Sequence, residues 1–384
     1  MRAIGCGAFA LAGLLACSGT SGDGGGPATA FDASAGDGSL GGGHPGGDGS
    51  IASGDDGGAG DDASVPSDAS TGGDVDGAAD GVAGEAGGAL KPPPAALDWT
   101  YLPDTSLVSV RSIWGSGPND VYIVGSVGMG AHFDGAQWTS LDTGTSAHLT
   151  AVWGSGPNDV YIATESNALL HLGGDAGAWD HQVFGAGVEF SDIKGWSATD
   201  IYADGPGVIH FDTNAWSNPG IDSGDYGVDK LWVTGPADAW GESIYGGVYH
   251  YMGTSTVLST DTGPKLEQYE NSAIWASSDT DIYVTGANAI LHYRGSGTWE
   301  NQFPTPAPVD GGGEYLSAIW GFDANTIYAV SQTGMLYRSG GDGRWVSQQL
   351  PAPFAGSYPS CIWGSAPDDV YIGGDMGVIH GTKM

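Results

Sequence analysis

The chain has 384 residues, and its 10 Lys and Arg stand against 45 Asp and Glu, a formal net charge of -35. Such a charge repels the phosphates of nucleic acids and of anionic lipids, so we expect no nucleic-acid partner. With 3 cysteines, Cys6, Cys17 and Cys361, no disulfide framework remains once an export signal is removed.

Residues 1–16 have the features of a bacterial signal peptide. Arg2 precedes an apolar run too short to span a bilayer as a mature helix, and the run ends in Leu14-Leu15-Ala16-Cys17. That ending resembles the lipobox, where the chain is cut before a cysteine that carries a diacylglycerol. We expect lipidation at Cys17, with an ordinary secretory signal as the alternative. The serine after Cys17 favours the outer membrane or the cell surface, with membrane contact only through the lipid.

Residues 17–96 are predicted to be a disordered tether. The stretch is dominated by Gly, Ala, Ser and Asp and has no Trp or Tyr, so no burial could offset the entropy of ordering it. Its Asp-Gly runs lack the regular spacing of calcium loops, which favours a solvated spacer. The sequence Lys91-Pro92-Pro93-Pro94 stiffens the last step into the folded domain.

A unit that recurs seven times predicts the fold of residues 97–384. It is clearest in IWGSGPNDVYIVG (113–125) and VWGSGPNDVYIAT (152–164), and its spacings of 39, 41, 38, 43, 45 and 43 residues suit a four-stranded propeller blade. The spacings are measured along one column of residues: Trp114, Trp153, Lys194, Trp232, Trp275, Trp320 and Trp363. We therefore predict an all-β, seven-bladed β-propeller of four-stranded antiparallel blades.

Each unit is expected to contain four short strands. The first carries the Trp column, the second follows a turn that ends in Asp, and the fourth begins near a Trp such as Trp138. The third strand ends in one of these residues: His132, His171, His210, His250, His292, Tyr337 or His380. The seventh unit stops before a fourth strand, whereas Trp99 lies in a spare strand ahead of the first. We predict that this N-terminal strand completes the last blade and removes an exposed sheet edge.

The blade pattern, which includes Asp134-Gly135-Ala136-Gln137-Trp138, resembles the BNR/Asp-box and photosystem-II-assembly-factor-like propellers and the repeat propellers of bacterial surface lipoproteins. It keeps only the end of a true Asp-box. The resemblance covers residues 97–384 and implies architecture, because such propellers include sialidases, assembly factors and receptor ectodomains.

Residues that recur in every blade are interpreted as scaffold. The His column is expected to be buried and bonded to turn or backbone groups, because neighbouring blades hold these rings too far apart to share a metal ion. The Asp column, which includes Asp120 and Asp159, is expected to accept backbone N–H groups in the first turn. Cys361 is interpreted as a small core residue rather than a nucleophile. We expect no metal and no cofactor.

Residues that differ between blades are the candidates for binding. They concentrate in loops that share one face of a propeller, and they are aromatic or acidic, which suits a sugar or a cationic peptide. The alternative is that an acidic protein places such residues on every loop. The predicted ligand-binding residues are His148, Glu165, Glu189, Phe190, Asp204, Tyr226, Glu242, Tyr245, Tyr269, Glu270, Glu314, Tyr315, Tyr358 and Asp375.

The sequence favours a binding protein over an enzyme. A sialidase needs three converging arginines, but the predicted propeller has only Arg111, Arg294, Arg338 and Arg344, and we find no nucleophile, zinc or phosphate-loop motif. We predict a monomeric, lipid-anchored module that binds a protein or glycan at the bacterial cell envelope. The alternative is a carbohydrate-active hydrolase or lyase with its site at the mouth of the propeller.

Overall fold

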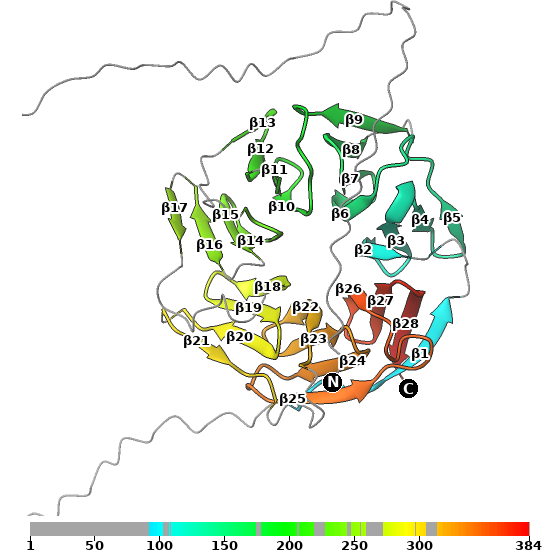
Figure 1. The fold of residues 1–384 in the computed structure, drawn as a ribbon, viewed down its shortest axis with the longest axis vertical. Coiled ribbons are helices and arrows are strands. Elements are labelled where there is room, and N and C mark those ends of the chain that lie inside the picture. The colour runs from blue at the N-terminus through cyan, green and yellow to red at the C-terminus, as the bar shows by residue number, and fades with distance from the viewer. Residues whose placement is uncertain are drawn as a thin grey trace, which may run out of the picture. The chain divides into compact units, whose positions relative to one another are not determined.

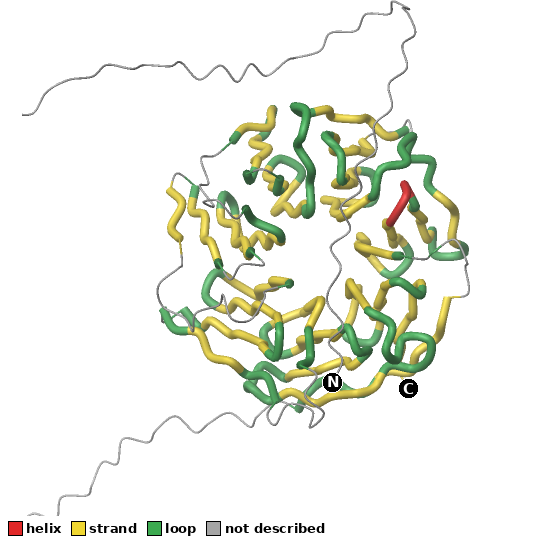
Figure 2. The backbone as a smooth tube through the Cα atoms, viewed as in Figure 1, coloured by secondary structure: helices red, strands yellow, loops and turns green. Residues whose placement is uncertain are grey.

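The structure is a computed structural model that describes residues 92–102, 107, 109–173, 178–205, 207–218, 227–243, 247–253, 255–258, 272–295, 297–304 and 313–383. The predicted signal peptide and residues 17–91 of the predicted tether lie outside these ranges. Seven four-stranded antiparallel sheets form the blades of a ring, which confirms the predicted fold (Figure 1). Figure 2 shows how strand and turn alternate around it, and the described residues include a short 3-10 helix, η1 (Ser126–Gly128). No helix within the described ranges is long and apolar enough to cross a membrane.

The first four blades follow the chain, each with its innermost strand first. They are β2 (Val110–Gly117), β3 (Asp120–Gly125), β4 (Gly130–Phe133) and β5 (Trp138–Ser140); β6 (Leu149–Gly156), β7 (Asp159–Thr164), β8 (Ala168–Gly173) and β9 (Trp179–Val183); β10 (Ile193–Ser197), β11 (Asp200–Ala203), β12 (Ile209–Asp212) and β13 (Ala215–Ser217); and β14 (Lys230–Gly235), β15 (Asp238–Glu242), β16 (Val248–Met252) and β17 (Ser255–Leu258).

The last three blades continue this order, except that the seventh takes its outermost strand from the start of the chain. They are β18 (Ala273–Ser278), β19 (Asp281–Gly286), β20 (Ala289–Tyr293) and β21 (Trp299–Asn301); β22 (Leu316–Asp323), β23 (Thr326–Ser331), β24 (Met335–Ser339) and β25 (Trp345–Gln349); and β26 (Pro359–Ala366), β27 (Asp369–Gly374) and β28 (Gly377–Lys383) with β1 (Leu97–Leu102).

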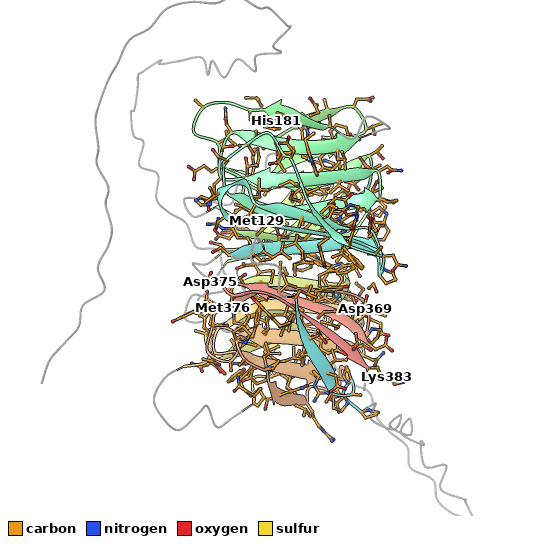
Figure 3. The ribbon with its side chains drawn as sticks, turned by 90° about the vertical axis from the view of Figure 1, so that its right-hand side faces the viewer. Met129, His181, Asp369, Asp375, Met376 and Lys383 are labelled. Carbon is orange, nitrogen blue, oxygen red and sulfur yellow. The ribbon has the colours of Figure 1, made fainter. Side chains whose placement is uncertain are left out.

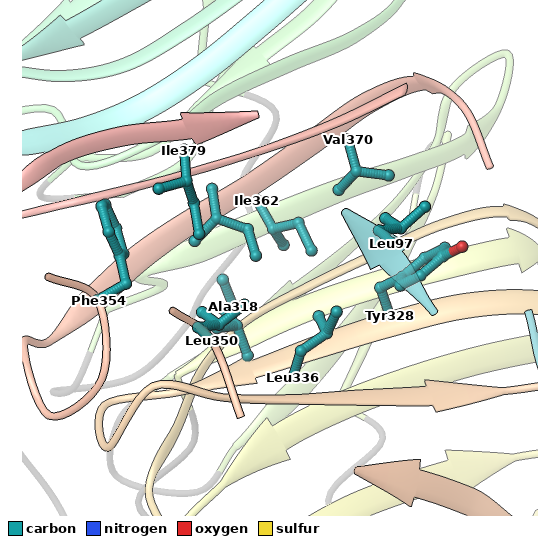
Figure 4. Close-up of a cluster of buried hydrophobic side chains, with 11 residues drawn as sticks. Leu97, Ala318, Tyr328, Leu336, Leu350, Phe354, Ile362, Val370 and Ile379 are labelled. Atoms are coloured by element: carbon teal, nitrogen blue, oxygen red, sulfur yellow. The ribbon is translucent and has the colours of Figure 1, made fainter. Parts of the chain in front are cut away.

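The ring closes through β1, as the sequence predicted. Leu97 pairs with Lys383 and Leu102 with Val378, so β1 is antiparallel to β28 along its whole length. The inner strand of each blade contacts that of the next, and β26 contacts β2, so the circle has no gap. Leu97 is 3% exposed and packs with Tyr328, Leu336 and Ile379 between blades six and seven (Figure 4).

Tryptophan packed on glycine joins neighbouring blades. A Cβ atom on Gly154 would lie 2.5 Å from the indole of Trp114, and one on Gly195 would lie 2.5 Å from that of Trp153. A methyl group at either site would collide with the ring, so a side chain of any size is excluded. The repeated Trp-Gly pair is therefore a packing device between blades, which agrees with the scaffold interpretation of the Trp column.

The recurring His and Asp bond to each other. This agrees with the expected turn partner of the His column, although of these six only His292 is buried, and it corrects the backbone partners expected for the Asp column. In six blades His Nε2 lies 2.5 to 2.8 Å from Asp Oδ1, and the imidazole stacks on an aromatic ring of the second strand at 3.9 to 4.2 Å. In four blades a serine of the first strand, such as Ser116, donates to the other carboxylate oxygen. The serine bonds to the carboxylate and not to the imidazole, so this is not the geometry of a Ser-His-Asp nucleophile.

Blade six departs from this pattern, and the departure corrects the sequence alignment by one residue. Tyr328 pairs with Arg338, so Arg338 and not Tyr337 takes the place of His, and Thr326 takes that of Asp. Arg338 is 6% exposed, and its Nη1 donates to the carbonyl oxygen of Pro94 at 2.6 Å. In blade six, Arg338 therefore binds the segment that leads into β1 in place of an Asp partner.

The two faces of the ring differ in what they carry. The face where the inner strands begin holds Asp375 and Met376, and we call it the mouth face; the face of the Asp-His pairs holds Asp369 and Lys383, and we call it the turn face (Figure 3). Leu97 pairs with Lys383, so the chain enters the ring on the turn face.

The closing strand gives a test of this fold. Leu97→Ala should lower the free energy of unfolding by about 2 to 5 kcal/mol, because it leaves a cavity in the seam between blades six and seven. Chemical denaturation with Trp fluorescence measures this. Asp98→Ala, on the exposed side of the same strand, is the matched control; equal effects of the two changes would contradict the role of β1.

Candidate ligand-binding pocket

The central channel holds a pocket of about 230 Å³ on the mouth side of the ring. Its walls are the inner strands of all seven blades, from the residues where these strands begin as far as the Trp column. Every blade therefore contributes to one site, and a residue that breaks the sevenfold pattern there changes the chemistry of the whole pocket.

Indole rings form the floor of the pocket. Trp320 lies 5.8 Å from Trp232 at 76° and 6.3 Å from Trp363, measured between ring centroids. Trp320 can contact these two indoles because Phe322, two residues later, packs against Gly364 of the next blade in its place. The floor offers edges and faces of aromatic rings, which suit an apolar or aromatic group.

Hydroxyl groups near the start of the inner strands join blades two and three, six and seven, and seven and one. Thr150 donates to the carbonyl of Phe190 at 2.8 Å, Ser317 to that of Pro359 at 2.5 Å and Ser360 to that of Val110 at 2.6 Å. These hydroxyls line the pocket, but their protons are used in the scaffold.

Charged residues replace uncharged ones in blades three and four only. In each blade, the inner-strand residue two positions before the Trp column lies next to a residue of the second strand. Blade by blade these neighbours are Ser112 and Val124, Ala151 and Ala163, Asp192 and Asp204, Lys230 and Glu242, Ala273 and Thr285, Ala318 and Val330, and Cys361 and Gly373. Blades three and four therefore place four charged residues where the repeat requires none, and the same region holds Lys194 in place of Trp.

Asp192 fastens blade three to blade four. Its Oδ2 accepts the backbone N–H of Leu231 at 3.0 Å, and its Oδ1 accepts from the N–H of Ile193 at 2.9 Å and from Nζ of Lys194 at 2.5 Å. The Asp192 side chain is thus shared among backbone donors and one ammonium group, although it also lines the pocket.

Asp204 and Glu242 lie behind Lys230 and are 0% exposed. Burial, and then the charge of Asp192, raises the pKa of Asp204 to about 8, and burial with the charge of Asp229 raises the pKa of Glu242 well above its ordinary value. Glu242 has no hydrogen-bond partner within the described ranges. Although burial alone would lower the pKa of Lys230, the charge of Asp192 and then those of the other nearby acids raise it, so Lys230 stays charged. At neutral pH we expect Asp204 to be mostly protonated behind this charged lysine.

Cys361 also lines the pocket, as part of the wall. Burial raises the pKa of its thiol to about 12, so the thiolate required of a nucleophile does not form at neutral pH. The side chain packs with Val110 and Val378, which agrees with a small core residue.

Three of the predicted ligand-binding residues lie on one arc of the mouth face. His148 Nδ1 accepts from the N–H of Val127 at 3.0 Å, and the Glu165 N–H donates to the carbonyl of His148 at 2.9 Å. The Glu165 carboxylate contacts the Arg111 guanidinium, and Asp375 is exposed. These loops border the pocket through Arg111, which belongs to its wall.

The other predicted residues are dispersed. Glu189 is exposed, Tyr315 is half-buried, and Tyr358 is 61% exposed with a φ of 49°. Phe190 is 1% exposed and packs on Phe184, and Glu314 is 4% exposed and accepts from Thr333 and Tyr337, so neither faces solvent. Tyr226, Tyr245, Tyr269, Glu270 and Cys17 lie outside the described residues. A ligand-binding role for the set stays a prediction.

Sequence reasoning missed the cations of the pocket. Lys194, Lys230 and Arg111 line it, whereas Asp192 is its only carboxylate within the described ranges. The signal was present, because Lys194 interrupts the Trp column and Lys230 interrupts a column of small residues. The prediction was based on residues that differ between the loops, which vary for many reasons, and it did not consider differences within the inner strands.

Comparison with known proteins supports the fold and leaves the family open. No family model matches the chain, and neither does any curated protein. Among solved structures it is similar to the photosystem II assembly factor YCF48 bound to D1 peptide, at a TM-score of 0.58 and 15% identity over 76% of this chain and 97% of that one. It is also similar to a virginiamycin B lyase from Staphylococcus aureus with quinupristin, at a TM-score of 0.64 and 10% identity over 75% of this chain and 100% of that one. For a GH74 xyloglucanase from Xanthomonas campestris the TM-score is 0.56 and the identity 14%, over 73% of this chain and 53% of that one.

These similarities show a shared propeller fold and no more. They agree with the predicted resemblance to assembly-factor propellers at the level of architecture, while the Asp-box and lipoprotein features stay predictions. The three neighbours carry different activities, so function must be argued from the pocket.

The raised pKa of Asp204 predicts how stability depends on pH. A carboxyl that stays protonated in the fold up to about pH 8, but ionises near pH 4 when unfolded, makes the fold less stable as pH rises between these values. Asp204→Asn keeps the site uncharged, so its melting temperature should fall less between pH 5 and pH 8.5 and exceed that of the wild type at pH 8.5 by at least roughly 2 °C.

Asp369→Asn is the control of opposite sign. Burial alone would raise the pKa of Asp369, but hydrogen bonds from His380 and Ser365 lower it, so its contribution is lost as pH falls. A pH profile of Asp204→Asn that parallels the wild type would contradict the assignment.

Proposed function

We propose that this protein is a lipid-anchored bacterial envelope protein whose propeller binds a protein partner through the pocket on its mouth face. The observation that carries the proposal is the convergence of repeat-breaking charged residues on one cavity. A scaffold repeats the same contact in every blade, and although Asp192 joins blades three and four, Lys194 and Lys230 place cations in the pocket where the repeat requires none. Glycan binding is the nearest alternative, since the Trp floor also suits a sugar.

The size of the pocket favours part of a partner over a whole small molecule. Its volume of about 230 Å³ lies below the roughly 300 to 1,000 Å³ of ordinary ligand pockets. It suits one inserted side chain or chain end, with the rest of the partner on the mouth face. A propeller of this fold is known bound to a peptide, which supports the mode of binding by analogy.

The course of the N-terminal segment supports an orientation. Arg338 holds Pro94 at 2.6 Å, and Gln348 Nε2 donates to the carbonyl of Leu97 at 3.2 Å, both on the turn face. A tether attached to a lipid at Cys17 would reach the ring on that face, opposite the pocket. The tether would then not run across the opening of the pocket.

The enzyme alternative has less support from the geometry. Asp204 and Glu242, which would be its acid groups, are fully buried behind Lys230 and do not line the pocket. Turnover of a glycan by the wild type, lost in Asp204→Asn or Glu242→Gln, would favour a hydrolase or lyase over the binding module.

Blocking the pocket tests the proposed function. Ala273 lines the pocket wall, so Ala273→Phe should fill part of the space without changing a charge. Immobilised wild-type protein is expected to retain a partner from an envelope extract that Ala273→Phe retains at least tenfold less. Mass spectrometry with labelled extracts gives the ratio.

The matched control is Val346→Phe, which adds the same side chain at a 44% exposed position on an outer strand. It should retain the partner fully. If every partner of the wild type is retained equally by Ala273→Phe, the pocket is not the binding site.

The turn-face contact gives a test of orientation. The double change Thr326→Asp and Arg338→His restores the pair found in the other six blades and removes the donor to Pro94. Residues 92–94 are prolines without an amide hydrogen, so the readout is the exchange of the amides of Ala95, Ala96 and Leu97. Their exchange should accelerate about tenfold or more, since one hydrogen bond to a charged group contributes about 1.5 to 3 kcal/mol. Exchange in β27 should not change in this variant, and the exposed control Arg294→Ala should leave the exchange of residues 95–97 unchanged. Unchanged exchange at residues 95–97 in the double variant would show that Arg338 does not hold this segment.

A further inference from the structure

Cations gather in the pocket against the charge of the chain. The described ranges contain seven Lys and Arg residues, and three of them, Arg111, Lys194 and Lys230, line this one cavity. The wall has a single carboxylate, that of Asp192, in a chain where acids outnumber bases 45 to 10. The pocket is therefore chemically unlike the rest of the protein.

Lys194 opens the pocket as well as charging it. In blades one, two, five and seven the indole at this position packs on a glycine of the next blade, as Trp153 packs on Gly195. Blade four has Val233 at the corresponding place, and the pocket extends one residue deeper along Gly195 and Val233 than along the remaining blades. The missing indole thus leaves space beside an ammonium group.

Asp192 and the other acids near Lys230 act on its charge from a distance, and not through a direct ion pair within the described residues. Its Nζ donates to the carbonyl of Ser191 at 3.4 Å, and within the described ranges no carboxylate lies within ion-pair distance of it. Asp192, which also lines the pocket, already accepts hydrogen bonds from two backbone N–H groups and from the ammonium group of Lys194. Asp204 is bound by the N–H groups of Ser191 and Asp192, at 2.9 and 2.5 Å.

Arg111 completes the set at the entrance. One of its nitrogens contacts Glu165, and its side chain is 34% exposed. A guanidinium has five N–H donors in a planar fork, so the contact with one carboxylate oxygen leaves donors for a second anion. Arg111 lies near the entrance, whereas Lys194 lies at the level of the indole floor, which can hold an apolar body.

We propose that the pocket binds a carboxylate of the protein partner, at a chain end or on an acidic side chain, with Lys194, Lys230 and Arg111 as donors and an adjoining apolar group on the tryptophan floor. This inference rests on the proposed function and specifies its ligand. A carboxylate suits the site better than a cation, because an added ammonium group would meet Lys194 and Lys230 at close range.

Paired small probes test the charge preference. N-acetylphenylalanine and N-acetylphenylalanine amide share an aromatic body and differ in one charge. Titration followed by Trp fluorescence and by saturation-transfer NMR should show the carboxylate binding at least tenfold more tightly than the amide, and the difference should shrink as salt is added. Glucuronate, as a sugar carboxylate, should bind more weakly than the aromatic acid.

Variants of the pocket identify the donors. Lys194→Met and Lys230→Met should each weaken binding of the acid about tenfold and leave the amide unchanged. Arg344→Met, which removes an equal charge at a side chain 70% exposed outside the pocket, should have no effect on either probe. If Lys230→Met does not fold because of the carboxyls behind it, Lys194→Met alone decides.

The outcomes separate this inference from the proposed function. Equal binding of acid and amide, or no effect of Lys194→Met, would overturn the carboxylate inference while the Ala273→Phe experiment could still support a pocket for neutral groups. Preference for glucuronate would overturn the assignment to a protein. If no probe binds and Ala273→Phe retains every partner, both proposals fail.

Discussion

Packing between neighbouring blades is the constraint on which the rest of this structure depends. Each inner strand must meet two others, and in four blades the indole fits only because the next blade has a glycine at the facing position, as with Trp114 on Gly154. The circle then needs an end, which β1 supplies by pairing with β28. Once closed, the ring holds seven strand starts around a fixed cavity that no single blade could form.

The repeat made the fold predictable and the pocket difficult to predict. Blade count, strand order and the closing strand followed from the spacing of the Trp column and from the spare Trp99, because a period of about 40 residues of this composition has few solutions. The register of blade six was predicted wrongly by one residue. Tyr337, an aromatic residue, was taken as the counterpart of the recurring His, but Arg338 occupies that position. The His-Asp pairs were also missed, because two residues about ten positions apart become neighbours only through the pairing of strands two and three.

The charged residues of blades three and four show the limit of reasoning from loops. Asp204 and Glu242 were singled out as binding residues on the mouth face, and the structure places both behind Lys230, where burial raises their pKa values. What reaches the pocket is the lysine. In a chain with such an excess of acids, the uncommon residue type carried more information than the common one.

The direction of β1 also has a mechanical consequence. Its first residue lies on the turn face, and its six residues pair with β28 in register toward the mouth. If an anchored chain holds Leu97 while a bound partner pulls from the other face, the force runs along the strand. All the hydrogen bonds of the pair then resist sliding together, instead of opening one after another as they would under a sideways pull. A strand that closes the ring is thus also arranged to withstand tension between its two attachments.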